Sequence, residues 1–419
     1  MYVQRICQIS DLTPLAHQWN GLTHGNPMRG HEWLRAWWDT FGQGYEPYVL
    51  TVRNDGGELI GIAPWCRQRR PLGGRVLQFL GGGDACSDHL SLLVRTSMTD
   101  AVATAIANWL GAANSPSDDR LSSQDDRWDQ IEWIGVDRED VPLRQLAVQL
   151  AARGHLQHDR DAPSCWVVRL PDTWDDFLHR LSKNHRKKLR RALAQLDMPG
   201  DGWNAERIQD LEEWQRRWPD LCRLHQRRRH SLGEQGLFDR PHFEGFLQRV
   251  AQSLLPSGQL ALYWLTFQGR PAAFELQLQG TDTMYAYQSG MEPELANESP
   301  GTMLFAHTIR DATRRGMRYF DLLRGDESYK QRWMADRVDC REQRIVARHV
   351  SARIRHGLWL AGGQLKRRFW NRVSKGYSHQ SDDTGTVHSA LVPVHMDGLV
   401  DGRTQGAGTL RLLSLGATS

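Results

Sequence analysis

The densest group of reactive side chains in this sequence follows a short apolar segment, 319–323. Segment 321–333 reads Asp-Leu-Leu-Arg-Gly-Asp-Glu-Ser-Tyr-Lys-Gln-Arg-Trp. A carboxylate can accept a proton from an attacking amine or hydroxyl, and a tyrosine can return one to a leaving thiolate or alkoxide. A loop at the carboxyl end of a strand is a frequent place for such chemistry. The simpler explanation is a polar turn before an exposed helix, and this segment alone favours it.

The acid–base candidates are Glu275, Asp321, Asp326, Glu327, Tyr329 and Lys330. Glu275 differs from the others because it lies inside an expected strand, 271–278. Side chains alternate between the two faces of a strand, so Glu275 points away from Phe274 and Leu276. If those two face the core, Glu275 is merely exposed, and we favour that explanation over a catalytic role.

A basic run without any acid occupies 180–191, inside a helix expected over 176–196. Its members are Arg180, Lys183, Arg186, Lys187, Lys188, Arg190 and Arg191. Helical spacing brings most of these side chains to one face. That face is either solvated or an anion site for phosphates, an acidic polymer or RNA, and both alternatives stay open.

Loop 291–301 leads from an expected strand into an expected helix, 301–315. Ser299 suits the N-cap and Pro300 the first turn. Free backbone N–H groups at a helix start can hold a phosphate, and Gly301 would let it approach closely. Helix capping alone explains the same residues and is favoured. The sequence has neither a Walker lysine motif nor Gly-x-Gly-x-x-Gly, so nucleoside triphosphate and dinucleotide binding lack support.

The composition is that of a globular protein in which we expect no metal site and no disulfides. The chain has 419 residues, a net charge of +4 and six scattered cysteines. The length predicts two domains and a tail, and the cysteines indicate reduced thiols. Segment 1–20 lacks the apolar core of a secretory signal, and no segment approaches the roughly 20 apolar residues of a membrane span. We therefore expect a cytoplasmic protein.

The two halves of the chain repeat one order of elements: hairpin, strand, loop, helix, strand. Segments 50–65, 100–110 and 130–135 in the first half correspond to 261–274, 301–315 and 318–325 in the second. This order predicts a duplicated α/β unit over 1–165 and 166–345, although short elements can also agree by chance. The remainder, 346–419, is expected to form a basic helix over 350–377 and a flexible tail.

The second half resembles the CelD/BcsL-type acetyltransferase family within the GNAT superfamily. The matching pieces, over about 166–335, are Phe177-x3-Leu181-Ser182-x2-His185-Arg186-x2-Leu189-Arg190-Arg191, Leu265-x3-Gly269-Arg270-Pro271-x-Ala273, Tyr285-x-Tyr287, Ser299-Pro300-Gly301-x2-Leu304, Gly316, and Phe320-Asp321-x3-Gly325-x-Glu327-x-Tyr329-Lys330-x-Arg332-Trp333. The first half resembles a second GNAT-like unit, as in FemAB-type transferases.

The resemblance implies an α/β (α+β) fold of two GNAT-like units, each a mixed sheet flanked by helices and split beside an acyl donor. It implies acetyl-CoA as co-substrate and a sugar or polysaccharide precursor as acceptor, in exopolysaccharide or cellulose biosynthesis. The implied donor-binding residues are Ser289, Ser299, Gly301, Thr302, Arg186 and Arg190. The implied catalytic residues are Asp321 and Glu327 as base or orienting carboxylates, Tyr329 as acid, and Lys330 as an anion contact.

Two other functions remain open. The first is a FemAB-like aminoacyl transfer from aminoacyl-tRNA, which the basic run favours. The second is a non-catalytic accessory role beside a membrane-bound polysaccharide synthase, with the basic helix 350–377 lying on the inner face of an anionic membrane.

Overall fold

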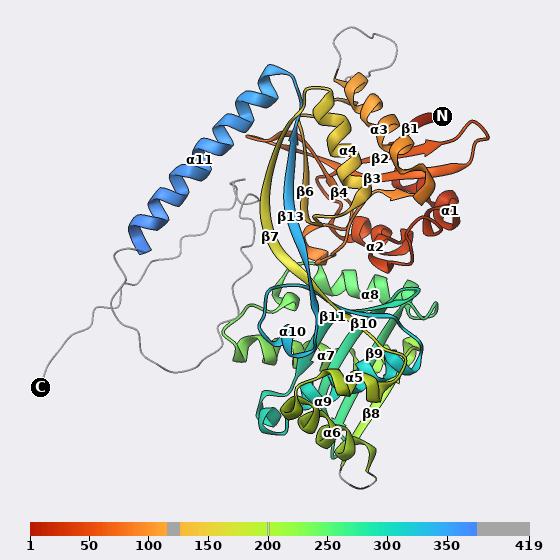
Figure 1. Ribbon diagram of the computed structural model, residues 1–419, viewed down its shortest axis with the longest axis vertical. Coiled ribbons are helices and arrows are strands. Elements are labelled where there is room, and N and C mark those ends of the chain that lie inside the picture. Colours follow the sequence, from red (N-terminus) through yellow and green to blue (C-terminus); the bar gives the residue numbers. More distant parts are fainter. Residues whose placement is uncertain (115–125, 199, 201, 375–419) are drawn as a thin grey trace, which may run out of the picture. The chain divides into compact units, whose positions relative to one another are not determined.

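The computed structural model describes residues 1–114, 126–198, 200 and 202–374, with the backbone alone described for 363–374. The described strands form one mixed sheet of 13 strands in the order β1-β2-β3-β4-β6-β13-β7-β12-β11-β10-β9-β8, with β5 beside β3 (Figure 1). The expected mixed α/β architecture is therefore confirmed.

The first half contributes β1 (Tyr2–Ile6), α1 (Ala16–Asn20), α2 (His31–Phe41), β2 (Glu46–Arg53), β3 (Leu59–Arg70), β4 (Gly74–Phe79), β5 (Leu93–Val94), α3 (Thr99–Ala113), β6 (Gln130–Asp137), α4 (Val141–Ala152) and β7 (Leu156–Arg169). The second half contributes α5 (Trp174–Arg180), α6 (Lys183–Asp197), β8 (Trp203–Ile208), α7 (Leu211–Ser231), α8 (Phe243–Leu254), β9 (Leu260–Phe267), β10 (Arg270–Gln279), β11 (Thr283–Met291), α9 (Pro300–Arg314), β12 (Tyr319–Arg324), α10 (Tyr329–Arg332), β13 (Asp336–Val346) and α11 (Val350–Ser374).

The strand order has the same pattern from both edges of the sheet, because the two halves exchange their last strands. Strand β7 ends the first half but pairs with β12 of the second, and β13 ends the second half but pairs with β6 of the first. Strands β7 and β13 then pair with each other at the centre. The boundary expected between positions 165 and 166 lies inside β7. The duplicated unit is present, and each copy completes the sheet of the other.

Each half has one place where two parallel strands separate. In the second half, β11 and β12 pair only from Thr283 with Tyr319 to Tyr285 with Asp321, although both strands continue. In the first half, β4 and β6 pair over three residues only. The aromatic ring of Phe79 on β4 stacks on Trp133 of β6 there, with ring centroids 6.4 Å apart. Aromatic side chains therefore fill the opening of the first half.

Aromatic packing joins the two halves. Trp33 of α2 is fully buried and makes edge contacts with Phe246 of α8 and Tyr287 of β11, with ring centroids 5.0 and 5.2 Å apart. The Tyr287 hydroxyl also donates a hydrogen bond of 2.7 Å to the carbonyl of Ala85. Burial of such large rings is a strong stabilising contribution, so the two halves share one core.

Several elements differ from their predictions. The helix expected over 176–196 is two helices, because the Ser182 side chain caps α6 by accepting a hydrogen bond from the His185 amide, 3.4 Å away. The strand expected at 89–94 is only Leu93–Val94. Strands β1, β7, β8 and β13 and helix α4 were not predicted from the sequence. Helix α11 is confirmed to Ser374, while 375–377 and the tail lie outside the described residues.

Candidate functional site

The end of β12 holds a strained backbone in place. Leu323 has a φ of +56°, which a branched side chain rarely adopts. The Asp321 carboxylate, on a residue only 3% exposed, accepts a hydrogen bond of 2.8 Å from the Leu323 amide. Strain of this kind persists only where the surroundings enforce it, and it is frequent at functional sites. Asp321 therefore shapes the loop that carries the other candidates.

Lys330 stabilises the end of β12 and the loop after it through contacts with three residues. Its ammonium group donates hydrogen bonds of 2.9 Å to the carbonyls of Leu323 and Gly325, and it lies 3.0 Å from a carboxylate oxygen of Glu327. These three partners match the three donors of an ammonium group. Gly325 has a φ of +130°, and a side chain there would collide with the Glu327 carboxylate. The contacts of Lys330 favour a positioning role within the loop.

Glu275 is buried, so the prediction that it is merely exposed was wrong. It is 7% exposed and stands between Tyr263 of β9 and Ser289 of β11. Directly opposite residues share a face of an antiparallel sheet, and the Tyr263 hydroxyl bonds Asp311 of α9, so this is the face that α9 covers. Burial raises the pKa of the Glu275 carboxyl well above its ordinary value.

The Tyr329 hydroxyl is electrostatically coupled to two carboxyl groups. Tyr329 exposes 45% of its surface, yet desolvation of the hydroxyl, followed by the charges of Glu327 and Glu275, raises its pKa. The charge of Glu275, for which the sequence favoured no catalytic role, therefore acts on the Tyr329 hydroxyl. A carboxyl with a raised pKa and a tyrosine in one site can serve proton transfer in both directions.

The start of α9 differs from the expected cap. Ser299 is the N-cap residue and Pro300 begins the helix, as predicted, but Ser299 has a φ of +55° and its side chain makes no capping hydrogen bond. No described side chain caps α9, and the first-turn amides at Gly301 and Thr302, both half-buried, are suited to an anion. Ser289 is exposed on the part of β11 that has separated from β12.

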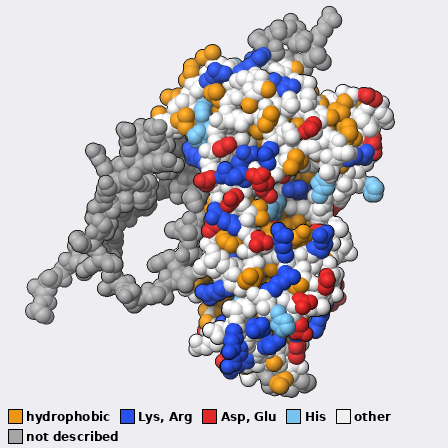
Figure 2. Space-filling model, viewed as in Figure 1, with side chains coloured by type: hydrophobic (Ala, Val, Ile, Leu, Met, Phe, Trp, Pro, Cys, Tyr) orange, Lys and Arg blue, Asp and Glu red, His pale blue; other side chains and the backbone are white. Residues whose placement is uncertain are grey.

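The basic run lies on α6 except for Arg180, which ends α5, and α6 packs against α9. Figure 2 shows Lys and Arg side chains gathered over α6. Among the described residues, none of its cations makes an ion pair; they are Lys183, Arg186, Lys187, Lys188, Arg190 and Arg191. The His185 ring bonds the carbonyl of Arg332 at 2.8 Å and contacts Trp333, so α6 is attached to the loop that carries Tyr329. Arg186 and Arg190 themselves make no described contact with that loop.

Two residues of the first half, His89 and Asp88, contact the end of β12, and neither contact was predicted from the sequence. His89 lies 2.9 Å from the second carboxylate oxygen of Asp321. Burial lowers the pKa of His89, but Asp321 outweighs this effect and raises it to about 9. Asp88 accepts a hydrogen bond of 2.9 Å from the Arg324 amide and lies 3.1 Å from its guanidinium. Since these partners lie far apart in the sequence, no local pattern could have indicated them.

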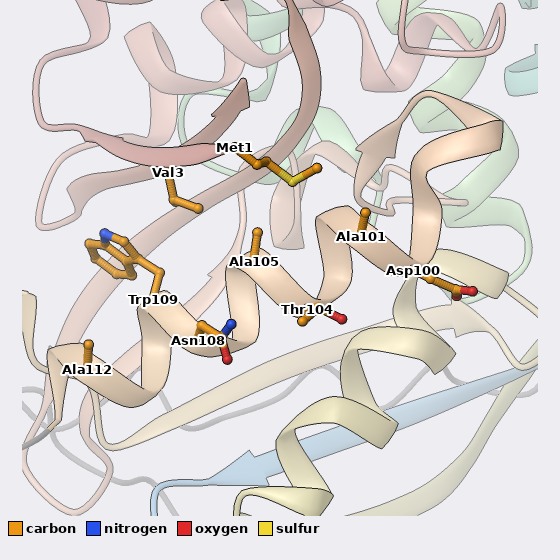
Figure 3. Close-up of a pocket in the computed structure, with 9 residues that line it drawn as sticks. All are labelled: Met1, Val3, Asp100, Ala101, Thr104, Ala105, Asn108, Trp109 and Ala112. Atoms are coloured by element: carbon orange, nitrogen blue, oxygen red, sulfur yellow. The ribbon is translucent and has the colours of Figure 1, made fainter. Parts of the chain in front are cut away.

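A separate open groove lies in the first half of the chain. The groove, of about 740 Å³, runs between the start of the chain and α3 (Figure 3). It is lined by Met1, Val3, Asp100, Ala101, Thr104, Ala105, Asn108, Trp109 and Ala112. Asp100 is the one acidic side chain of this lining, so the groove offers no acid–base pair comparable to Glu275 and Tyr329.

Comparison with known proteins agrees with this geometry. Residues 183–331 match the family described as an acetyltransferase (GNAT) domain. No curated protein matches the sequence. The CelD/BcsL subfamily stays a prediction.

Solved structures extend the likeness over both units. FemX is 12% identical with a TM-score of 0.57, over 83% of this chain and 98% of FemX. The C-terminal domain of a putative lysylphosphatidylglycerol synthetase from Agrobacterium fabrum is 10% identical with a TM-score of 0.50, over 85% and 96% of the two chains. At such identities the likeness establishes the fold alone. The GNAT-like fold expected from the resemblance is thus confirmed.

Proposed function

We propose that this protein transfers an acetyl or other acyl group from acyl-CoA to an amine or hydroxyl of a sugar-linked acceptor, in exopolysaccharide or cellulose biosynthesis. The observation that carries the proposal is the buried Glu275 carboxyl on the face of the sheet that α9 covers, with its charge acting on the Tyr329 hydroxyl. The GNAT domain match supports the acyl transfer. The sugar acceptor rests on the family resemblance.

We assign a proton acceptor, a proton donor and two positioning residues to the proposed acyl transfer. The Glu275 carboxylate accepts the proton of the acceptor amine or hydroxyl as its nitrogen or oxygen attacks the thioester carbonyl. The carbon–sulfur bond breaks, and the Tyr329 hydroxyl donates a proton to the leaving thiolate. Asp321 and Lys330 hold the loop on which Tyr329 and Glu327 sit. No acyl group becomes attached to the protein.

The start of α9 is the proposed donor site. The amides of Gly301 and Thr302 face no described side-chain cap, so a pyrophosphate can accept their hydrogen bonds. A side chain at position 301 would approach the Met291 sulfur to 3.3 Å, which explains why a small residue suits this position. Ser289 and Ser299 flank the site, and Arg186 and Arg190 supply positive charge from α6.

Calorimetry with acetyl-CoA and an acyl-transfer assay on candidate sugar acceptors test this proposal. Tyr329→Phe removes the proton donor, so we expect kcat to fall by about 10²-fold while the acetyl-CoA Kd is unchanged. Tyr2→Phe is the matched control, because Tyr2 exposes 53% of its surface far away in the sequence, on β1. Absence of acetyl-CoA binding by the wild-type protein would refute the proposal.

Aminoacyl transfer from aminoacyl-tRNA is the second candidate, favoured by the unpaired cations of α6. Removing one cation that binds a phosphate lowers the salt dependence of nucleic-acid binding by about one unit of slope. We expect the triple variant Lys187→Gln, Lys188→Gln and Arg191→Gln to lower the slope of log Kd against log salt by about 3. Arg144→Gln, on the surface of α4, is the control. If wild-type protein binds no tRNA, or if the triple variant keeps its slope, this candidate is excluded.

A further inference from the structure

Helix α11 is attached to the rest of the protein along one of its faces. The Trp359 ring lies against the guanidinium groups of Arg344 and Arg160, whose central carbons are 3.6 and 4.0 Å from the ring centroid. Ala352 and His356, two turns and one turn earlier, are buried at 3% and 8% exposure. Residues three and four apart share a side of a helix, so these three side chains form one attached face.

A second face of α11 carries an exposed apolar line. Val350, Ile354 and Leu358 expose 72%, 58% and 61% of their surfaces. The three residues are spaced four apart, so their side chains line up along the helix. This line lies on a different side of the helix from Trp359. Single exposed apolar residues are ordinary, but an aligned group of large ones marks an interaction surface.

The charge of this segment indicates what covers the apolar line. From 350 to 377 the sequence contains no Asp or Glu, and its cations are Arg353, Arg355, Lys366, Arg367, Arg368, Arg372 and Lys375. A basic helix with an apolar line complements an anionic lipid surface, where the apolar side chains enter the interface and the cations meet the headgroups. Arg355 is the exception, because its guanidinium lies 2.8 Å from the Asp129 carboxylate. A second copy of the same helix would instead bring like charges together.

We infer that α11 binds the surface of a lipid bilayer that contains anionic lipids, with Val350, Ile354 and Leu358 inserted at the interface. The attached face joins α11 to the rest of the protein, whereas the apolar line is exposed. Lipid binding therefore needs no rearrangement of Trp359. No described helix is long and apolar enough to cross a bilayer, and the inferred contact is with one surface only. The inference does not depend on the proposed acyl transfer.

Vesicle flotation of the full chain tests the inference. The probes are vesicles of phosphatidylcholine alone and of phosphatidylcholine mixed with phosphatidylglycerol. We expect the wild-type protein to float with the mixed vesicles only, and the double variant Ile354→Ser/Leu358→Ser to partition at least about tenfold more weakly, because two large inserted side chains are removed. Val148→Ser is the matched control, since Val148 exposes 62% on α4, and it is expected to float like the wild type.

Three results would overturn the inference. The first is a wild-type protein that ignores the mixed vesicles. The second is a double variant that binds them as tightly as the wild type, which would assign binding to other cations such as those of α6. The third is a wild-type dimer in light scattering that the double variant dissociates, which would make a second copy the occupant. Circular dichroism and an unchanged Tm confirm that the variants are folded.

Discussion

Glu275→Gln is expected to lower the rate of acyl transfer by about 10² to 10⁴-fold. The amide keeps the size and the hydrogen-bonding capacity of the side chain but cannot accept the acceptor's proton. Acetyl-CoA affinity should be unchanged, because the proposed donor contacts lie at the start of α9. Steady-state kinetics across pH provide the measurement. Since burial raises the pKa of Glu275, the wild-type rate should rise with pH through a value well above that of an ordinary carboxyl.

The same variant should be more stable than the wild type at high pH. Folding raises the pKa of this carboxyl. As the pH increases above the carboxyl's pKa in the unfolded state, the folded protein loses stability, because the folded state disfavours the charged form. Glutamine avoids this cost. We therefore expect a higher Tm for Glu275→Gln at pH 8 and little difference at pH 4, where the carboxyl is fully protonated in the folded state and mostly protonated in the unfolded state. Opposite effects on activity and stability are typical of functional residues.

Glu139→Gln is the matched control, because its exposed ion pair with Arg144 contributes little. Equal activity of Glu275→Gln and the wild type would show that Glu275 is a buried structural residue. Wild-type protein without any transfer activity, in contrast, would support the accessory role beside a polysaccharide synthase.

Asp321→Asn is expected to destabilise the protein by about 3 to 5 kcal/mol, because it leaves buried His89 without its opposite charge. The loss should depend on pH. The folded-state pKa of His89 is raised to about 9, so its stabilising contribution is complete below about pH 6.5, the unfolded value, and disappears as pH rises through 9. Urea unfolding at pH 6 and at pH 9.5 gives the measurement, and the difference from the wild type should shrink at the higher pH.

A double-mutant cycle with His89→Gln separates the ion pair from other effects of Asp321. If the pair dominates, the double variant loses little more than either single variant. Asp39→Asn is the control, because Asp39 forms an exposed pair with Arg35 on α2. The same loss for Asp321→Asn at both pH values would mean that the Leu323 amide, and not His89, is the important partner.

Local patterns in the sequence determined the repeated order of elements and the place of the candidate loop. Alternating apolar residues and glycine-containing turns identified the hairpins that became β2–β3 and β9–β10. The charged segment that begins at Asp321 was expected at the end of a strand, and the structure places it there. These features depend on neighbours a few residues away, so the sequence alone carries them.

Tertiary structure alone decided the role of Glu275 and the exchange of the last strands. Alternation indicates that Glu275 and Phe274 face opposite sides, but only the packing of α9 on one side and α7 on the other buries both faces of β10. Strands β7 and β13 each pair with a strand of the other half, and His89 meets Asp321 across the same junction. Such contacts join residues that are distant along the chain, and their energies depend on burial that no local segment specifies.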